Sequence, residues 1–126
     1  MAKKMETASK RPLGTINISP DAIAMVAGIA TLQCFGIVGM ASRTIQDGIS
    51  DLLTGKDNLA KGIEVVINEE RVFVELNIIV EYGVRIKEVA NNVIESVRYA
   101  IKNQFGLQAA KVNVIVQGVR FEKTKQ

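Results

Sequence analysis

The sequence has no histidine and a single cysteine, Cys34. Histidine is the commonest general base near neutral pH and the commonest metal ligand, so its absence excludes Ser-His-Asp hydrolysis and His-dependent zinc chemistry. A single cysteine excludes an internal disulfide and a thiolate cluster for zinc or iron–sulfur, and it suits a reducing cytosol. We therefore expect no enzymatic activity, no catalytic residues, no cofactor and no metal, and we expect Cys34 to be buried.

Charge is absent from residues 22–42, although charged residues recur every few positions elsewhere. As one helix these 21 residues would rise about 32 Å, enough to cross a bilayer's hydrocarbon core. Only seven of them are Leu, Ile, Val or Phe, and Gly36 and Gly39 interrupt the segment. Ser19 can cap a helix just upstream, and Pro20 fits the first helical position. The segment therefore predicts a buried helix followed by a glycine-flanked strand, with no transmembrane span.

The predicted helix, residues 20–33, has two uncharged sides. The large apolar side consists of Ile23, Met25, Val26, Ile29 and Leu32, and the small side consists of Ala24, Ala27, Gly28 and Thr31. A helix without a polar side is covered on both sides. In a chain this short we expect another subunit to cover the small side, because small residues permit close backbone approach. This predicts a homo-oligomer, with the small side as a candidate interaction surface.

The hydrophobic pattern of the remaining chain predicts an α/β fold. Period-2 alternation predicts strands at residues 14–19, 35–41, 63–68, 71–81 and 112–121, and 3.6-residue periodicity predicts helices at residues 44–53 and 84–105. The last strand, helix and strand form a βαβ unit with parallel strands. The pair Glu69-Glu70 predicts a tight turn between two antiparallel strands. We expect a two-layer α+β sandwich with a mixed sheet of four to five strands and two to three helices.

The formal charge of +3 is concentrated at the ends of the chain. Residues 1–15 and residues 111–126 each carry a net charge of +3, and the part between them carries −3. Phosphate contacts need concentrated Lys and Arg, so this distribution disfavours a nucleic-acid partner. The basic ends can touch an anionic membrane surface or nucleic acid weakly, or serve only as solubilising ends. We divide the chain into a flexible basic arm at 1–13, a single domain at 14–121 and a basic tail at 122–126.

Two further residue sets are candidates for function or for backbone geometry. Tyr99 projects from the polar side of the long predicted helix, where its ring either lies along neighbouring side chains or contacts a partner. The spacing of the first two glycines of the strand at 35–41 lacks the lysine of a P-loop and the third glycine of a dinucleotide fingerprint. A bulge or a close backbone crossing explains such glycines without a ligand. The set interpreted in this way is Gly36, Gly39, Gly83 and Gly118.

Four segments follow one another in an order typical of one protein family. They are GTINISPDAIAMVAG at 14–28, CFGIVGMAS at 34–42, IIVEYGVRIKEVANNV at 78–93 and VNVIVQGVRF at 112–121. Together they resemble the alkaline shock protein family, also called the envelope stress response family, and most of all its YloU-like branch. Arg120 lies in the last segment, which adds it to the candidate interaction surface. The family has no agreed catalytic residues to carry over.

The resemblance implies a small α/β domain of Gram-positive bacteria, cytoplasmic or attached peripherally to the inner face of the cell membrane. Members are linked to cell-envelope homeostasis, reach the membrane through partner proteins, and in some branches are tied to fatty-acid metabolism. We therefore expect a non-enzymatic scaffold or adaptor that self-associates and binds an envelope or lipid-metabolism protein. The alternative is an RNA- or nucleic-acid-binding regulatory module, which the negative middle of the chain and the lack of Lys or Arg near Gly36 and Gly39 oppose.

Overall fold

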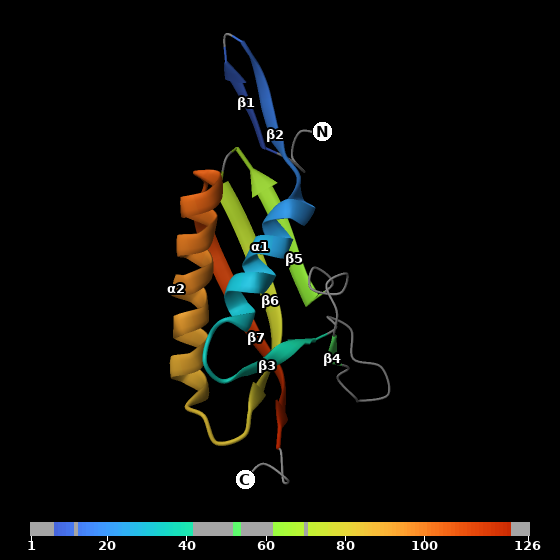
Figure 1. Ribbon diagram of the computed structural model, residues 1–126, viewed down its shortest axis with the longest axis vertical. Coiled ribbons are helices and arrows are strands. Elements are labelled where there is room, and N and C mark those ends of the chain that lie inside the picture. Colours follow the sequence, from blue (N-terminus) through green and yellow to red (C-terminus); the bar gives the residue numbers. More distant parts are fainter. Residues whose placement is uncertain (1–6, 12, 42–51, 54–61, 70, 122–126) are drawn as a thin grey trace.

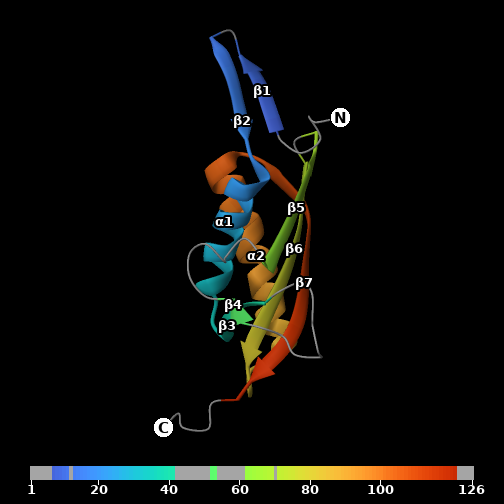
Figure 2. The ribbon, with the colours of Figure 1, turned by 90° about the vertical axis from the view of Figure 1, so that its right-hand side faces the viewer.

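The computed structural model describes residues 7–11, 13–41, 52–53, 62–69 and 71–121. A five-stranded mixed sheet carries both described helices on one face, and a separate two-stranded hairpin projects from one end of the molecule (Figure 1). The hairpin is formed by β1 (Thr7–Arg11) and β2 (Gly14–Ile18). Figure 2 shows the two layers edge-on, with both helices on the same side of the sheet. The predicted α+β two-layer fold is confirmed.

The centre of the sheet is β6 (Arg71–Glu81). Along one edge it pairs in parallel with β7 (Gln108–Arg120), and this pairing spans its full length. Its other edge is shared by two antiparallel strands, because β5 (Ile63–Asn68) pairs with its first half and β3 (Ile37–Ala41) with its second. The short strand β4 (Leu52–Leu53) extends the sheet beyond β3.

The hairpin between β5 and β6 confirms the expected tight turn. Asn68 pairs with Arg71, so the connection has two residues, and Glu69 adopts a positive φ of 53°. Primed two-residue turns require positive φ, which glycine adopts at no steric cost and glutamate does not. The pairing on both flanks holds this residue in the conformation that the turn needs.

The charge-free segment is split between a helix and a strand, as expected. Helix α1 (Pro20–Leu32) begins where the backbone N–H of Ala22 donates to Ser19 Oγ at 3.2 Å, with Pro20 in the first turn. The chain then turns and enters β3. None of the helices in the described parts of the chain is long and apolar enough to cross a membrane.

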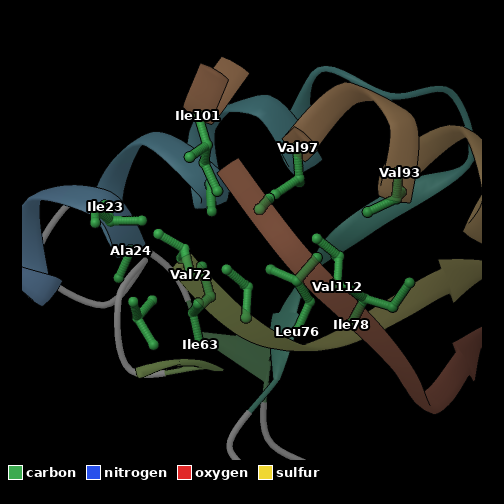
Figure 3. Packing of buried hydrophobic residues seen from close by; sticks show 14 of the residues in the cluster. Ile23, Ala24, Ile63, Val72, Leu76, Ile78, Val93, Val97, Ile101 and Val112 are labelled. Atoms are coloured by element: carbon green, nitrogen blue, oxygen red, sulfur yellow. The ribbon is translucent and has the colours of Figure 1, made fainter. Parts of the chain in front are cut away.

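Helix α2 (Ile86–Phe105) connects β6 to β7 and completes the predicted βαβ unit. It ends at Gly106, whose φ of 71° is the left-handed conformation usual after a helix. Its inward residues are Val89, Val93, Val97 and Ile101, and they meet the inward residues of β6, which are Val72, Val74, Leu76, Ile78 and Val80. Figure 3 shows side chains of both sets pointing into the space between the layers. Each buried aliphatic side chain stabilises the fold by about 1.5–3 kcal/mol.

The prediction for α1 is wrong about which side is free. The small side, Ala24, Ala27, Gly28 and Thr31, is buried inside the fold, whereas Ile29 and Leu32 are exposed. Small residues let α1 approach α2 and the sheet closely, and Thr31 Oγ1 satisfies its buried hydroxyl by donating to Ala27 O at 2.8 Å. These four residues are therefore not an interaction surface. Periodicity showed two apolar sides but could not show which of them faces the sheet.

Two local predictions also differ from the structure. Thr7–Arg11 lie within the segment expected to be a flexible arm, yet they pair with β2 as strand β1. The helix expected at residues 44–53 is wrong at Leu52 and Leu53, which pair with Ala41 and Met40 as β4, and its other residues lie outside the described part of the chain. Both differences arise from pairing with distant residues, which a local periodicity does not contain.

Candidate protein-binding groove

A hollow of about 560 Å³ lies between the end of α1 and the side of α2. We call it the aromatic groove. Its lining residues are Ala30, Gln33, Cys34, Phe35, Asn92, Ser96, Tyr99, Ala100, Asn103 and Gln104. None of them is charged, and two of them are aromatic.

Phe35 stands at the mouth of the aromatic groove because the chain after it passes close to α2. Gly36 has φ of +89°, and a Cβ built there would lie 3.0 Å from Cγ2 of Val89 and 3.3 Å from Cγ1 of Val84. Only glycine fits this crossing, since an L side chain would suffer both an unfavourable φ and a steric clash. The N–H of Glu81 donates to Gly36 O at 2.9 Å and anchors the crossing to the end of β6. The Phe35 side chain is left 80% exposed.

The other wall is one side of α2. Asn92, Ser96, Tyr99 and Asn103 recur at helical spacing, so they share the side that faces the end of α1. Tyr99 is 70% exposed. Of the two interpretations offered by the sequence, contact with a partner now has geometric support, because this ring and Phe35 flank the same uncharged hollow.

Cys34 lies in the floor of the aromatic groove and is half-buried, less than the sequence analysis expected. Its Sγ lies 3.5 Å from both Ala30 O and Ser96 Oγ, so the thiol can donate a weak hydrogen bond to either oxygen. No lining residue is a histidine, lysine or carboxylate that could deprotonate the thiol. Among the described residues, no group of three His, Cys, Asp or Glu could hold a metal ion. The groove therefore offers surface for binding and no reactive group.

Arg120 is not part of the aromatic groove. It lies at the end of β7, opposite Glu81 in the register, and its backbone oxygen accepts from the N–H of Tyr82 at 2.9 Å. That contact places it near the first turn of α2, whereas Tyr99 lies about 20 Å along the helix from Ile86 at 1.5 Å per residue. The candidate surface expected from the sequence is thus divided: Tyr99 lies in the groove and Arg120 at the other end of the helix.

The four glycines named from the sequence lie in turns and strands. Gly83 has φ of +99° in the turn after β6, with open space around it. Gly39 follows a register shift between β3 and β6, and Gly118 follows one between β6 and β7. The residue that sequence analysis missed is Phe35, which was placed inside the strand at 35–41. A positive φ at the glycine after it ends the turn before the strand can begin.

Comparison with known proteins agrees with this fold and with the four motifs. Residues 8–121 match the model of the alkaline shock protein family, which is described as having a cell envelope-related function. The chain belongs to the alkaline shock protein family. One relative within it, the uncharacterized protein YloU of Bacillus subtilis (strain 168), is 46% identical over 108 residues, covering 85% of this chain and 89% of YloU.

A second relative of this alkaline shock family member is the uncharacterized protein Spy1614 of Streptococcus pyogenes serotype M6. It is 41% identical over 108 residues, which cover 85% of this chain and 88% of Spy1614. The uncharacterized protein YqhY of Bacillus subtilis is 29% identical over 114 residues, which cover 90% of this chain and 83% of YqhY. No solved structure matches the chain. The family assignment confirms the resemblance found in the sequence, including its YloU-like character.

Proposed function

We propose that this alkaline shock family member is a non-enzymatic scaffold or adaptor in cell-envelope homeostasis, and that it holds a partner protein in the aromatic groove. The observation that supports the proposal most directly is the pair of exposed rings, Phe35 and Tyr99, beside a hollow with no charged lining residue. Cores of protein–protein interfaces are enriched in aromatic residues and depleted of charged ones. The amide side chains of Asn92, Asn103 and Gln104 can hydrogen-bond a partner's backbone or polar groups.

The two rings are large enough to supply most of the binding energy. A buried aromatic side chain covers about 150–250 Å², and about 25 cal/mol is gained per Å² of apolar surface removed from water. Covering the exposed part of one ring is therefore worth about 2–3 kcal/mol before the costs of association. Truncating either ring should weaken binding about 10- to 100-fold.

The partner that we propose is a protein of the cell envelope or of lipid metabolism. A cytoplasmic adaptor bound to such a protein would reside at the inner face of the membrane and could affect fatty-acid metabolism through that contact. The aromatic groove has no Lys or Arg in its lining, and phosphate recognition depends on these residues. The nucleic-acid alternative therefore receives no support from this site.

Self-association is a further part of the proposal, and α1 supplies its contact side. Ile29 and Leu32 are exposed one helical turn apart on this helix, and no charged residue lies between them. Light scattering coupled to size-exclusion chromatography would measure the mass at micromolar concentration. We expect a dimer or larger species, and a monomer at all concentrations would contradict self-association.

The aromatic groove is tested by quantitative capture from the native host. Tagged wild-type protein, the double variant Phe35→Ala/Tyr99→Ala and the control Phe73→Ala would be used to recover membrane-fraction proteins. Phe73 is also an exposed aromatic, but it lies on the sheet face away from the helices. We expect envelope proteins bound by wild type and by Phe73→Ala to be lost from the double variant. Equal recovery by the double variant would overturn the assignment of the groove.

A further inference from the structure

A second feature suited to binding is the free edge of β7. Within the described residues β7 pairs only with β6, so the backbone groups on its other edge have no strand partner. Natural proteins protect such edges with charged side chains, bulges or covering elements. Residues 112–119, VNVIVQGV, contain no charge and five β-branched residues, and one bulge interrupts them before Gly118. By contrast, β5 at the opposite edge of the sheet carries the charged residue Glu64.

The apolar core is left partly open along this edge. The inward residues of β6 are fully buried, whereas Val114 and Val116 of β7 are only half-buried and Val119 is 48% exposed. Ile94 of α2 is likewise half-buried. Figure 1 shows α2 along the flank of the molecule beside β7, on the side away from β5. A narrow apolar strip therefore runs between α2 and the edge of β7, where a further strand of the sheet would lie.

Two cations border this strip. Arg98 and Lys102 follow Ile94 by four and eight residues, so they share its side of α2, which is not the side that carries Ser96 and Tyr99 into the aromatic groove. Together with residues 106–109 they line a hollow of about 340 Å³ where α2 ends and β7 begins. Both side chains are exposed, and neither forms an ion pair with another described residue.

We propose that the edge of β7 accepts an extended segment of a partner protein as an added strand. Alternate apolar side chains of that segment cover Val114, Val116 and Ile94, and acidic side chains at its end bind Arg98 and Lys102. The main chain supplies affinity through ladder hydrogen bonds, and the alternate side chains supply specificity. This surface is separate from the aromatic groove, so the protein would hold two partner segments at once.

A second copy of the chain does not fit this edge. Strands that pair across an edge lie about 4.7–4.9 Å apart, whereas packed helices need about 8–10 Å between their axes. Because α2 runs along the flank beside β7, a second copy paired through its own β7 would bring its α2 into the same space. A single extended segment adds no helix and meets no such obstacle.

Synthetic peptides test the proposal on the full-length protein. The probe is a fluorescent peptide of alternating Thr and Val with two aspartates at each end, and its comparison peptide carries lysines in place of the aspartates. We expect the aspartate peptide to bind about tenfold more tightly, since two charge-assisted contacts are at stake. Amide exchange should slow at alternate residues of 112–119 when it binds. The double variant Arg98→Glu/Lys102→Glu should reverse the preference for the two peptides.

Matched variants separate the edge from the groove. Ile94→Glu should abolish binding of the aspartate peptide, whereas Asn92→Glu, on the groove side of the same helix, and Tyr99→Ala should bind as wild type does. Circular dichroism of each variant verifies that α2 is intact. Equal binding of both peptides, or binding without protection of residues 112–119, would overturn the proposal. So would protection of those amides that rises with protein concentration alone, because a second copy would then occupy the edge.

Discussion

A buried amide in the centre of the sheet gives the sharpest test of how this fold is held together. Asn77 is 1% exposed although it lies on the face of β6 away from the helices. Its Nδ2 donates to Gly62 O at 3.2 Å, and its Oδ1 accepts from Gln117 Nε2 at 2.8 Å. One side chain thus joins the start of β5 and the bulge of β7 to the central strand.

Replacing Asn77 with alanine should lower the free energy of unfolding by about 2–4 kcal/mol. Losing the partner of a buried polar group costs about 1–3 kcal/mol, and Gly62 O loses its amide donor in this variant. The space left by the removed side chain adds about 1 kcal/mol. With a urea m-value of about 1–3 kcal/mol/M for a small domain, the midpoint should fall by roughly 1–2 M.

Urea unfolding monitored by circular dichroism would measure this change. Asn113→Ala is the matched control, because that asparagine is exposed in β7 on the same face of the sheet. Exposed substitutions of this kind change stability by less than about 0.5 kcal/mol. If the two alanine variants unfolded at the same urea concentration, the bonds of Asn77 would contribute no net stability and the reasoning would be refuted.

Three other substitutions test how α1 and the crossing after it are built. Gly36→Ala should lower the free energy of unfolding by about 2–3 kcal/mol, from positive φ and a clash together, and Gly83→Ala by only about 1 kcal/mol, because open space surrounds it; equal thermal shifts would contradict this. Ala27→Leu should destabilise by about 1–3 kcal/mol through overpacking, whereas Ile29→Ala should cost less than about 1 kcal/mol because its side chain is exposed; the reverse order in Tm would restore the orientation first expected from the sequence. Ser19→Ala should lower stability by about 1 kcal/mol through loss of the cap, and an unchanged unfolding midpoint would mean that the helix start does not depend on this bond.

The candidate site was visible in the sequence only in part. Tyr99 was recognisable because an aromatic residue on the polar side of an amphipathic helix has no place in the core. Phe35 was not, because its exposure depends on the positive φ of Gly36 and on the approach of that glycine to Val89. A pattern of residue types specifies neither a backbone angle nor a contact between residues 53 positions apart in the chain.

The sequence by itself determined the elements and the family. Local periodicity and caps set α1, α2 and the strands that have their own alternation, because those signals act between neighbouring residues. Tertiary structure alone decided which side of α1 is buried, that β5 and β3 share one edge of β6, and that β7 is left with a free edge among the described strands. These features depend on how distant segments pack against one another, since two apolar sides of a helix are equivalent until a sheet covers one of them.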